Sequence, residues 1–287
     1  MSFTIMTDSA ANLPEEYLAE QGIRCISYDF LIDGEKPEAF VFDGRRFYDD
    51  MRGGRLVTTS QIPPQRYADF FRGALARGED LLFVGMSSGI SGSFQSASIA
   101  AEELRAEFPE RRLRLVDALG ASLGEGLLVV WAAEYRARGL SADEAADALQ
   151  ERRYAMCQVF TVDDLRYLKR GGRLSNLAAA VGTVLQIKPL LKGDREGKIV
   201  CFDKIRGRRH AIEAMAEQFN AFALRLPGQT VGIAHADCEQ EMGYLISLLR
   251  RLREGLRIMT VCYEPVTGSH VGPGTLALFF EGSPAFR

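Results

Sequence analysis

The chain has 287 residues, of which 47% are hydrophobic and 25% are charged, and its formal net charge at pH 7 is −3. This composition is typical of a globular protein and argues against a disordered chain or a nucleic-acid-binding protein. The apolar run at residues 127–133 is far shorter than the roughly 20 residues that span a bilayer. Because the first ten residues also lack the basic start and apolar stretch of a signal peptide, we expect a cytoplasmic protein.

In the first half of the chain, apolar strand-like runs alternate with helical patterns. This alternation is typical of βα units around a mostly parallel sheet with flanking helices. A chain of this length usually forms two domains, and we place an N-terminal α/β domain at residues 1–155. The expected strands are residues 3–7, 24–32, 81–86 and 112–116, and the expected helices begin near Pro14 and cover residues 64–77, 93–108 and 121–138, with one more after a capping-box sequence at 141–144.

After residue 156 the pattern changes to strands that return through hairpins and helices. This order indicates an α+β domain with a largely antiparallel sheet, which we place at residues 156–287. A hairpin is expected at 193–197, because that segment holds two glycines and an aspartate. The expected strands are residues 157–162, 187–191, 198–202, 230–234, 257–263 and 275–280, and the expected helices are residues 163–170, 177–185, 208–222 and 239–253.

The five cysteines and three histidines are dispersed along the chain. No two cysteines lie close together in the sequence, and their odd number argues against a disulfide framework. His210, His235 and His270 form no cluster with the spacing of zinc ligands. We therefore expect no metal site and no cofactor.

Three loops rich in hydroxyl groups adjoin expected strands and helices of the first domain. They lie at residues 7–9, 58–61 and 87–93, and they contain little positive charge. In an open parallel sheet, ligands bind beyond the carboxyl ends of the strands, where such loops meet. Hydroxyls and backbone N–H groups at a helix N-terminus suit an anion held by neutral donors. For each loop taken alone, helix capping is the alternative interpretation.

Ser91 raises the question of nucleophilic catalysis. The elbow pattern G-x-S-x-G would require glycine at position 93, where the chain has Ser93. A hydrolase acting on an acyl or phosphoryl ester would therefore depend on a Ser91–His270–Asp8 triad that no motif supports. The G-x-x-x-x-G-K-[ST] sequence of a P-loop is also absent from the chain.

In the second domain, the glycine-rich segment 268–274 is expected to be a loop between two apolar strands, with His270 near its start. Glycines allow close backbone approach, and an imidazole can donate a hydrogen bond to an anion. A turn histidine without function is the alternative interpretation. Lys188 lies in an apolar stretch, where its charge requires a partner.

Short motifs along the whole chain form a recognisable set in a fixed order. They are Thr7-Asp8-Ser9, TTSQIPP at 58–64, GISGSFQSA at 89–97, Val116-Asp117 followed by Ser122, VDDLRYLKRGGRLS at 162–175, IKPLL at 187–191 and GSHVGPG at 268–274. Each motif is weak alone, but the ordered set resembles the DegV family of bacterial fatty-acid-binding proteins.

The resemblance implies a lipid-binding protein that buries a long-chain fatty acid between its two domains and is not itself an enzyme. It also implies a partner, a separate ATP-dependent fatty acid kinase that converts the presented carboxylate into an acyl phosphate for phospholipid synthesis. Arg206 is the expected contact for this kinase. A regulatory lipid sensor that supports no kinase is an alternative, besides the hydrolase. The expected head-group contacts are Thr59, Ser91 and His270, with Ser60 and the Gly92 backbone beside them.

Overall fold

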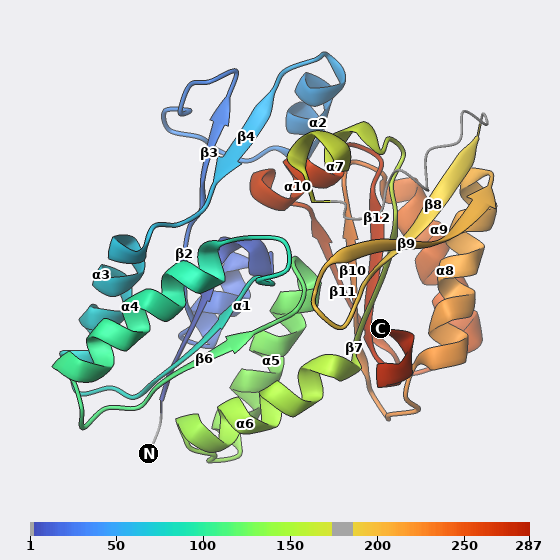
Figure 1. Ribbon diagram of the computed structural model, residues 1–287. Helices are drawn as coiled ribbons and strands as arrows, with labels where there is room; N and C mark the ends of the chain where they lie inside the picture. The colour runs from blue at the N-terminus through green and yellow to red at the C-terminus, as the bar shows by residue number, and fades with distance from the viewer. Residues whose placement is uncertain (1–2, 174–185) are drawn as a thin grey trace. The chain divides into compact units, whose positions relative to one another are not determined.

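The computed structural model describes residues 3–173 and 186–287, and its contacts divide the chain into two units (Figure 1). Unit 1 consists of residues 1–29 and 59–154, and unit 2 consists of residues 30–58 and 155–287. The chain therefore passes from one unit to the other three times. Residues 30–58 group with the C-terminal half, whereas the expected domains, 1–155 and 156–287, place them in the N-terminal one.

The sheet of unit 1 is parallel, as the alternating pattern predicts. Its strands follow the order β2-β1-β5-β6, and each described pair of neighbours is parallel. The interior strand β5 is buried at every position, which explains why its sequence LLFVG is an uninterrupted apolar run. The strands are β1 (Thr4–Asp8), β2 (Arg24–Ile26), β5 (Leu81–Gly85) and β6 (Leu113–Asp117).

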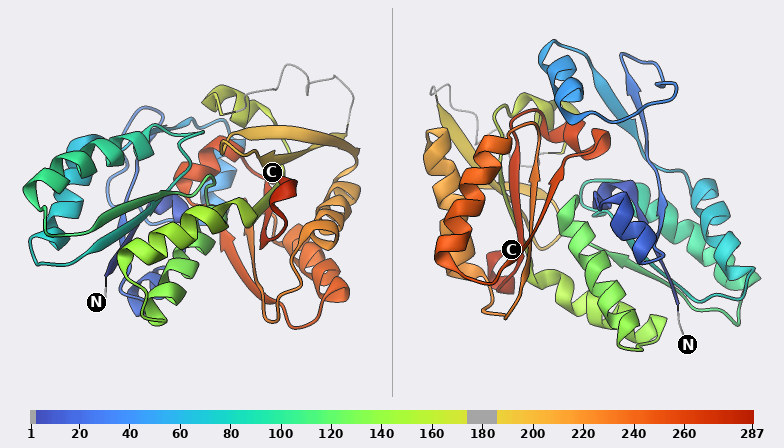
Figure 2. Two further views of the ribbon diagram at one scale, coloured as in Figure 1. Left: turned by 60° about the horizontal axis from the view of Figure 1, so that its bottom comes forward. Right: turned by 180° about the vertical axis from the view of Figure 1, so that it is seen from behind.

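Two helix pairs flank this sheet (Figures 1 and 2): α3 packs with α4, and α5 packs with α6. Helix α5 is buried along most of its length, and its sequence LGEGLLVVWAAEYRA is accordingly apolar on nearly all sides. Helix α6 begins with the expected capping box, in which Ser141 and Glu144 accept each other's backbone N–H. The helices of unit 1 are α1 (Glu15–Glu20), α3 (Pro64–Leu75), α4 (Ser93–Glu107), α5 (Leu123–Ala137) and α6 (Ala142–Arg152), with 3-10 turns at Ser9–Ala11 and Arg153–Ala155.

The main sheet of unit 2 is largely antiparallel, also as expected. Its strands follow the order β11-β10-β12-β7-β8-β9, and the described pairs are antiparallel apart from β10–β11. Strands β8 and β9 form the expected hairpin, whose turn is closed by the Asp194 carboxylate accepting the N–H groups of Glu196 and Lys198. The strands are β7 (Met156–Thr161), β8 (Ile187–Gly193), β9 (Ile199–Arg206), β10 (Thr230–His235), β11 (Arg257–Cys262) and β12 (Leu276–Glu281).

Helices α8 and α9 pack on each other and on this sheet. Buried side chains of both helices and of the strands form the core of unit 2. Phe219 of α8 and Phe280 of β12 meet edge to face there, with ring centroids 5.2 Å apart. A second helix pair, α7 and α10, packs together elsewhere in the unit. The helices are α7 (Arg166–Gly171), α8 (Arg208–Phe222), α9 (Glu239–Leu252) and α10 (Pro265–Val271), and a 3-10 turn lies at Pro284–Phe286.

The segment 30–58 contains a helix that is absent from the expected elements. This helix, α2 (Gly44–Arg52), lies between the paired strands β3 (Asp29–Ile32) and β4 (Val57–Ser60). Its N-terminus is capped by the Asp43 carboxylate, which accepts the N–H of Arg46 at 3.0 Å. Strand β2 and strand β3 also replace the single strand expected over residues 24–32.

The prediction of a loop over residues 268–274 is wrong, because the first four of these residues belong to helix α10. Glu264 caps that helix by accepting the N–H groups of Val266 and Thr267, and Pro265 occupies the first helical position. His270 therefore lies in the last turn of a short helix. The helix expected over 177–185 lies outside the described residues. Within the ranges that the structure describes, no helix is long and apolar enough to cross a membrane.

Candidate functional site

The loops after β1 and β5 are joined by the buried carboxylate of Asp8. One of its oxygens accepts the N–H of Ala10 at 3.0 Å and the other accepts the N–H of Met86 at 3.1 Å. Asp8 is 1% exposed, so these bonds form out of contact with water. The carboxylate therefore holds the start of the hydroxyl loop at 87–93 against the end of β1.

Ser91 lies in the middle of this loop and is partly buried. Its N–H donates to the Ser87 carbonyl at 3.1 Å, and its hydroxyl oxygen accepts the N–H of Ser93 at 3.2 Å. Among the described residues, no acceptor binds the proton of the Ser91 hydroxyl. The loop thus fixes the hydroxyl and leaves its proton available to a ligand.

Gln61 and Ile62, which follow β4, pack against the same loop. The N–H of Ile62 donates to the Ser93 hydroxyl at 3.1 Å. The Gln61 amide lies so close to Gly92 that a Cβ atom on residue 92 would be 2.2 Å from its Oε1. Thr59 is partly buried and Ser60 is exposed. Four of the expected ligand-contacting residues belong to unit 1. Gln61 is an additional polar group beside Gly92 that the motifs did not single out.

A buried carboxyl group contacts the first of these loops. Glu125 of α5 is fully buried and accepts the Thr7 hydroxyl at 2.9 Å. Burial, together with the neighbouring Asp8 carboxylate, raises the pKa of Glu125 well above its usual value. In its protonated form the Glu125 carboxyl can donate a hydrogen bond to Asp8.

His270 belongs to unit 2, at the C-terminal end of α10. Its imidazole packs directly on Gly171, where a Cβ atom would lie 2.3 Å from Nδ1. Burial and the nearby guanidinium groups of Arg173 and Arg170 lower the pKa of His270 to about 4. The imidazole is therefore neutral at pH 7, with one nitrogen as donor and the other as acceptor.

The motifs around residues 163–173 and 268–274 interlock. The Tyr167 ring occupies the space of a Cβ at Gly272, and the Asp163 carboxylate occupies that at Gly274. Asp163 also accepts the Lys188 ammonium group at 2.8 Å. Lys188 thus has the partner that its apolar surroundings require, and the glycines allow α7 and α10 to approach closely.

Arg206, the residue expected to contact a kinase, is exposed at the end of β9 in unit 2. Its carbonyl oxygen accepts from the His210 ring at 3.2 Å, and its guanidinium forms no ion pair with a described residue. Neighbouring Arg208 and Arg209 are instead paired with carboxylates. Arg206 is therefore an exposed cation that has no carboxylate partner among the described residues.

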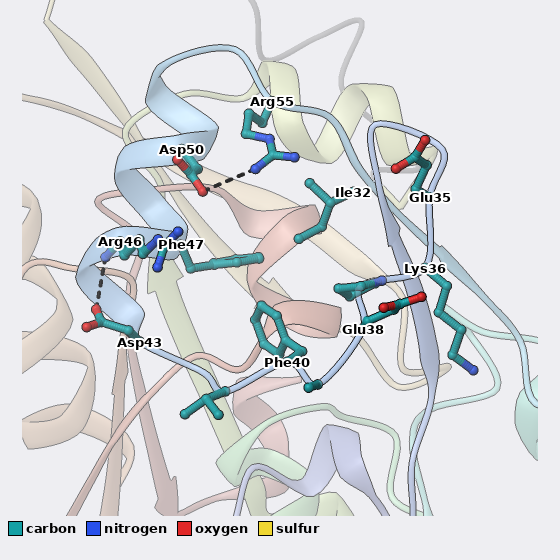
Figure 3. A pocket seen from close by; sticks show the side chains of 13 residues that line it. Ile32, Glu35, Lys36, Glu38, Phe40, Asp43, Arg46, Phe47, Asp50 and Arg55 are labelled. Carbon is teal, nitrogen blue, oxygen red and sulfur yellow. Dashed lines mark hydrogen bonds and ion pairs between the residues drawn. The ribbon is translucent and has the colours of Figure 1, made fainter.

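A pocket of about 550 Å³ lies in the segment 30–58 of unit 2 (Figure 3). Its apolar wall is formed by Ile32, Phe40 and Phe47, and the two phenylalanine rings are in edge-to-face contact. Charged side chains surround this wall, including the pair formed by Asp50 and Arg55. None of the expected site residues lines the pocket, and the sequence patterns gave no sign of it.

The geometry does not favour the hydrolase alternative. Among the described residues, no histidine forms a hydrogen bond with the Ser91 hydroxyl, as the base of a catalytic triad would. Both oxygens of Asp8, the third member of the expected triad, accept backbone N–H groups. Over residues 3–173 and 186–287, no group of three or more His, Cys, Asp or Glu side chains is arranged to hold a metal ion.

Comparison with known proteins agrees with the motif set. A family model described as "Uncharacterised protein, DegV family" matches residues 2–283. A DegV domain-containing protein of Clostridium perfringens is 35% identical over 283 residues, which cover 98% of this chain and 97% of the relative. A solved DegV family protein of Thermus thermophilus, described for its fatty acid binding, is 30% identical with a TM-score of 0.87, over 99% of this chain and 100% of that one. DegV of Bacillus subtilis, described as a fatty acid binding protein, is 29% identical with a TM-score of 0.84 and the same coverage. The chain belongs to the DegV family.

Proposed function

We propose that the chain binds a long-chain fatty acid. In this proposal Thr59, Ser91 and His270 contact the carboxylate, with Ser60 and the Gly92 backbone beside them. The observation that carries the proposal is the Ser91 hydroxyl, whose oxygen is fixed within the loop while its proton is left for a ligand. The fatty-acid-binding relatives from Thermus thermophilus and Bacillus subtilis support it, because they match this chain over almost its whole length.

The energetics of such binding do not require a cationic head-group site. Burial of a tail of roughly 16 carbons, at about 0.8 kcal/mol per CH₂, contributes on the order of 10 kcal/mol before the costs of immobilisation. The head-group contacts then need only orient the carboxylate. Neutral donors suffice for this, namely the hydroxyls of the loops and the neutral imidazole of His270.

We further propose that the protein is a carrier that presents the carboxylate to a separate ATP-dependent kinase. A carboxylate oxygen attacks the γ-phosphorus of ATP, ADP leaves, and the acyl phosphate formed serves phospholipid synthesis. Neutral donors support this role because they leave the carboxylate oxygen nucleophilic, whereas a bidentate arginine would occupy both oxygens. The exposed guanidinium of Arg206 is the proposed contact for the kinase.

The first test is mass spectrometry of an organic extract from protein purified without added lipid, together with native mass spectrometry of the intact protein. Stoichiometric long-chain fatty acid is the expected result. Protein that remains empty after incubation with palmitate and oleate contradicts the proposal. If that empty protein hydrolyses an activated ester without a kinase, the function is that of a hydrolase.

The carrier role is tested separately with three variants. Ser91→Ala is expected to reduce acyl phosphate formation more strongly than it reduces fatty acid affinity, because the tail supplies most of the binding energy. Arg206→Ala is expected to abolish complex formation with the kinase while fatty acid affinity stays within about twofold. Arg195→Ala, at another exposed position of the same hairpin, is the matched control. Equal behaviour of the two arginine variants would remove Arg206 from the proposal.

A further inference from the structure

Tyr48 connects helix α2 to the helix that carries His270. The Tyr48 side chain is fully buried, and its hydroxyl donates to the carbonyl oxygen of Tyr263 at 2.7 Å. Tyr263 directly precedes Glu264, the residue that caps α10. The phenol therefore holds the chain at the point where α10 begins.

The same hydroxyl also touches the middle of α10. At Gly268, a Cβ atom would lie 2.2 Å from the Tyr48 hydroxyl oxygen and 3.1 Å from Cζ of the same ring. The first distance is far below ordinary van der Waals contact, so only glycine fits beside the phenol without movement. Gly268 lies two residues before His270, within the hydrogen-bonded turn that the Gly268 N–H closes on Glu264 at 2.8 Å. A seven-residue helix touched at its entry and at its centre has little freedom to shift.

Helix α2 is itself fixed to the rest of unit 2. Arg52 forms an ion pair with Asp237, which follows β10. The hydroxyl of Tyr167 donates to the carbonyl of Met51 at 3.4 Å, and the ring of Tyr167 packs on Gly272 after α10. Tyr48 is therefore presented to α10 by a helix that is held at its C-terminal end from two sides.

We propose that Tyr48 is a positioning residue for His270: its hydroxyl and ring set the place of α10, and with it the place of the imidazole against Gly171. The functional meaning of this inference rests on the proposed contact between His270 and the fatty acid carboxylate. The positioning itself concerns unit 2 alone and can be measured without any ligand.

The experiment compares Tyr48→Phe with Tyr135→Phe in the ligand-free, full-length protein. Tyr135 is a matched control, because it is also a buried tyrosine and its hydroxyl accepts a hydrogen bond from Arg152, but in unit 1. The imidazole signals of His270 are followed by NMR over a pH titration and assigned with His270→Gln. Circular dichroism and urea unfolding verify that each variant is folded.

Tyr48→Phe is expected to shift the His270 signals and to move their titration midpoint upward by about half a pH unit or more, because a displaced imidazole is less buried and farther from Arg170 and Arg173. Fatty acid affinity is expected to fall by about fivefold, the equivalent of one hydrogen bond. Tyr135→Phe is expected to leave the signals, the midpoint and the affinity unchanged. Wild-type signals in Tyr48→Phe, or an equal change in both variants, would overturn the inference.

A second pair keeps the test decisive if the tyrosine variants unfold. Gly268→Ala adds a methyl group against the Tyr48 hydroxyl, whereas Gly243→Ala in α9 adds one in open space. Only Gly268→Ala is expected to move the His270 signals. If Gly268→Ala moves the signals but His270→Gln binds fatty acid as tightly as wild type, the positioning of His270 by Tyr48 stands and the proposed contact of His270 with the carboxylate is refuted. If instead His270→Gln weakens binding while neither Tyr48→Phe nor Gly268→Ala moves the signals, the positioning is refuted and the carboxylate contact stands.

Discussion

The imidazole of His270 lies directly against the backbone of Gly171, so close that a Cβ atom on residue 171 would be 2.3 Å from Nδ1. This contact joins the last residue of α7 to the last turn of α10. The double glycine at 171–172 therefore does more than end a helix, because its first member provides the surface on which the histidine rests.

Gly171→Ala is expected to displace His270 and to weaken fatty acid binding by about tenfold, the equivalent of 1.4 kcal/mol. Residue 171 is helical, and alanine stabilises helices relative to glycine by up to about 1 kcal/mol. Any loss of fatty acid affinity must therefore come from the displaced histidine and not from a less stable α7. Displacement of a fluorescent fatty acid measures the affinity, and Gly243→Ala is the control. Unchanged affinity would show that the imidazole accommodates the methyl group.

Gly92→Ala is expected to cost less than about 1 kcal/mol in the free energy of unfolding. The clash is with the end of the Gln61 side chain, which is exposed and can rotate, and residue 92 has an ordinary φ of −74°. In a Gln61→Ala background the same substitution is expected to be neutral, so urea unfolding of the double-mutant cycle should give a coupling energy. A loss of more than about 2 kcal/mol in both backgrounds would mean that the loop backbone moves instead.

Glu125→Gln is expected to flatten the dependence of stability on pH above about pH 5. The pKa of Glu125 is raised in the folded protein above its ordinary value of 4.5, so the folded state retains a proton that the unfolded chain releases. The contribution of Glu125 to the free energy of unfolding is present in full below pH 4.5 and is lost as the pH rises through the pKa of Glu125 in the folded protein. Glutamine keeps the neutral shape and can still accept from Thr7 and donate to Asp8. Urea unfolding between pH 5 and 8 measures both slopes; parallel slopes would show that Glu125 ionises in the folded protein.

His270→Gln is expected to reduce the loss of stability in acid. Because the pKa of His270 is lowered from 6.5 to about 4, the unfolded chain binds a proton in this interval that the folded protein does not. The contribution of His270 to the free energy of unfolding is therefore complete above pH 6.5 and disappears as the pH falls towards 4. Thermal unfolding at several pH values measures the difference, with His210→Gln at an exposed position as the control. A wild-type slope in His270→Gln would place the imidazole in contact with solvent.

Most of the sheet strands could be predicted from the sequence, because buried strands such as LLFVG in β5 are continuous apolar runs bounded by turn residues. Helix α2 is absent from the expected elements although the sequence contains its signal, because Phe47, Tyr48 and Met51 recur at helical spacing after the capping residue Asp43. The glycines in and after helix α10 predict a loop in place of the helix. Glu264 followed by Pro265 is a helix-start signal that would have revealed it.

The hydroxyl loops of the site could also be predicted, since serine, threonine and glycine follow the ends of strands in a parallel sheet, where ligand sites form. The neutral state of His270 could not, because it depends on the burial of the imidazole in the folded protein and on Arg173 and Arg170, which are almost a hundred residues away in the chain. The contact of Gln61 with the loop could not be predicted either, because only the folded loop brings its amide against Gly92.

The three passages of the chain between the units determine how the protein can be cut into fragments. A fragment ending near residue 155 would carry α2 without the strands and helices on which Tyr48 and Met51 are buried, and would expose those side chains to water. Such a fragment is prone to aggregate, whatever the stability of the parallel sheet that it contains. An autonomous N-terminal half would need residues 30–58 replaced by a short linker, and an autonomous C-terminal half would need the same residues joined to it.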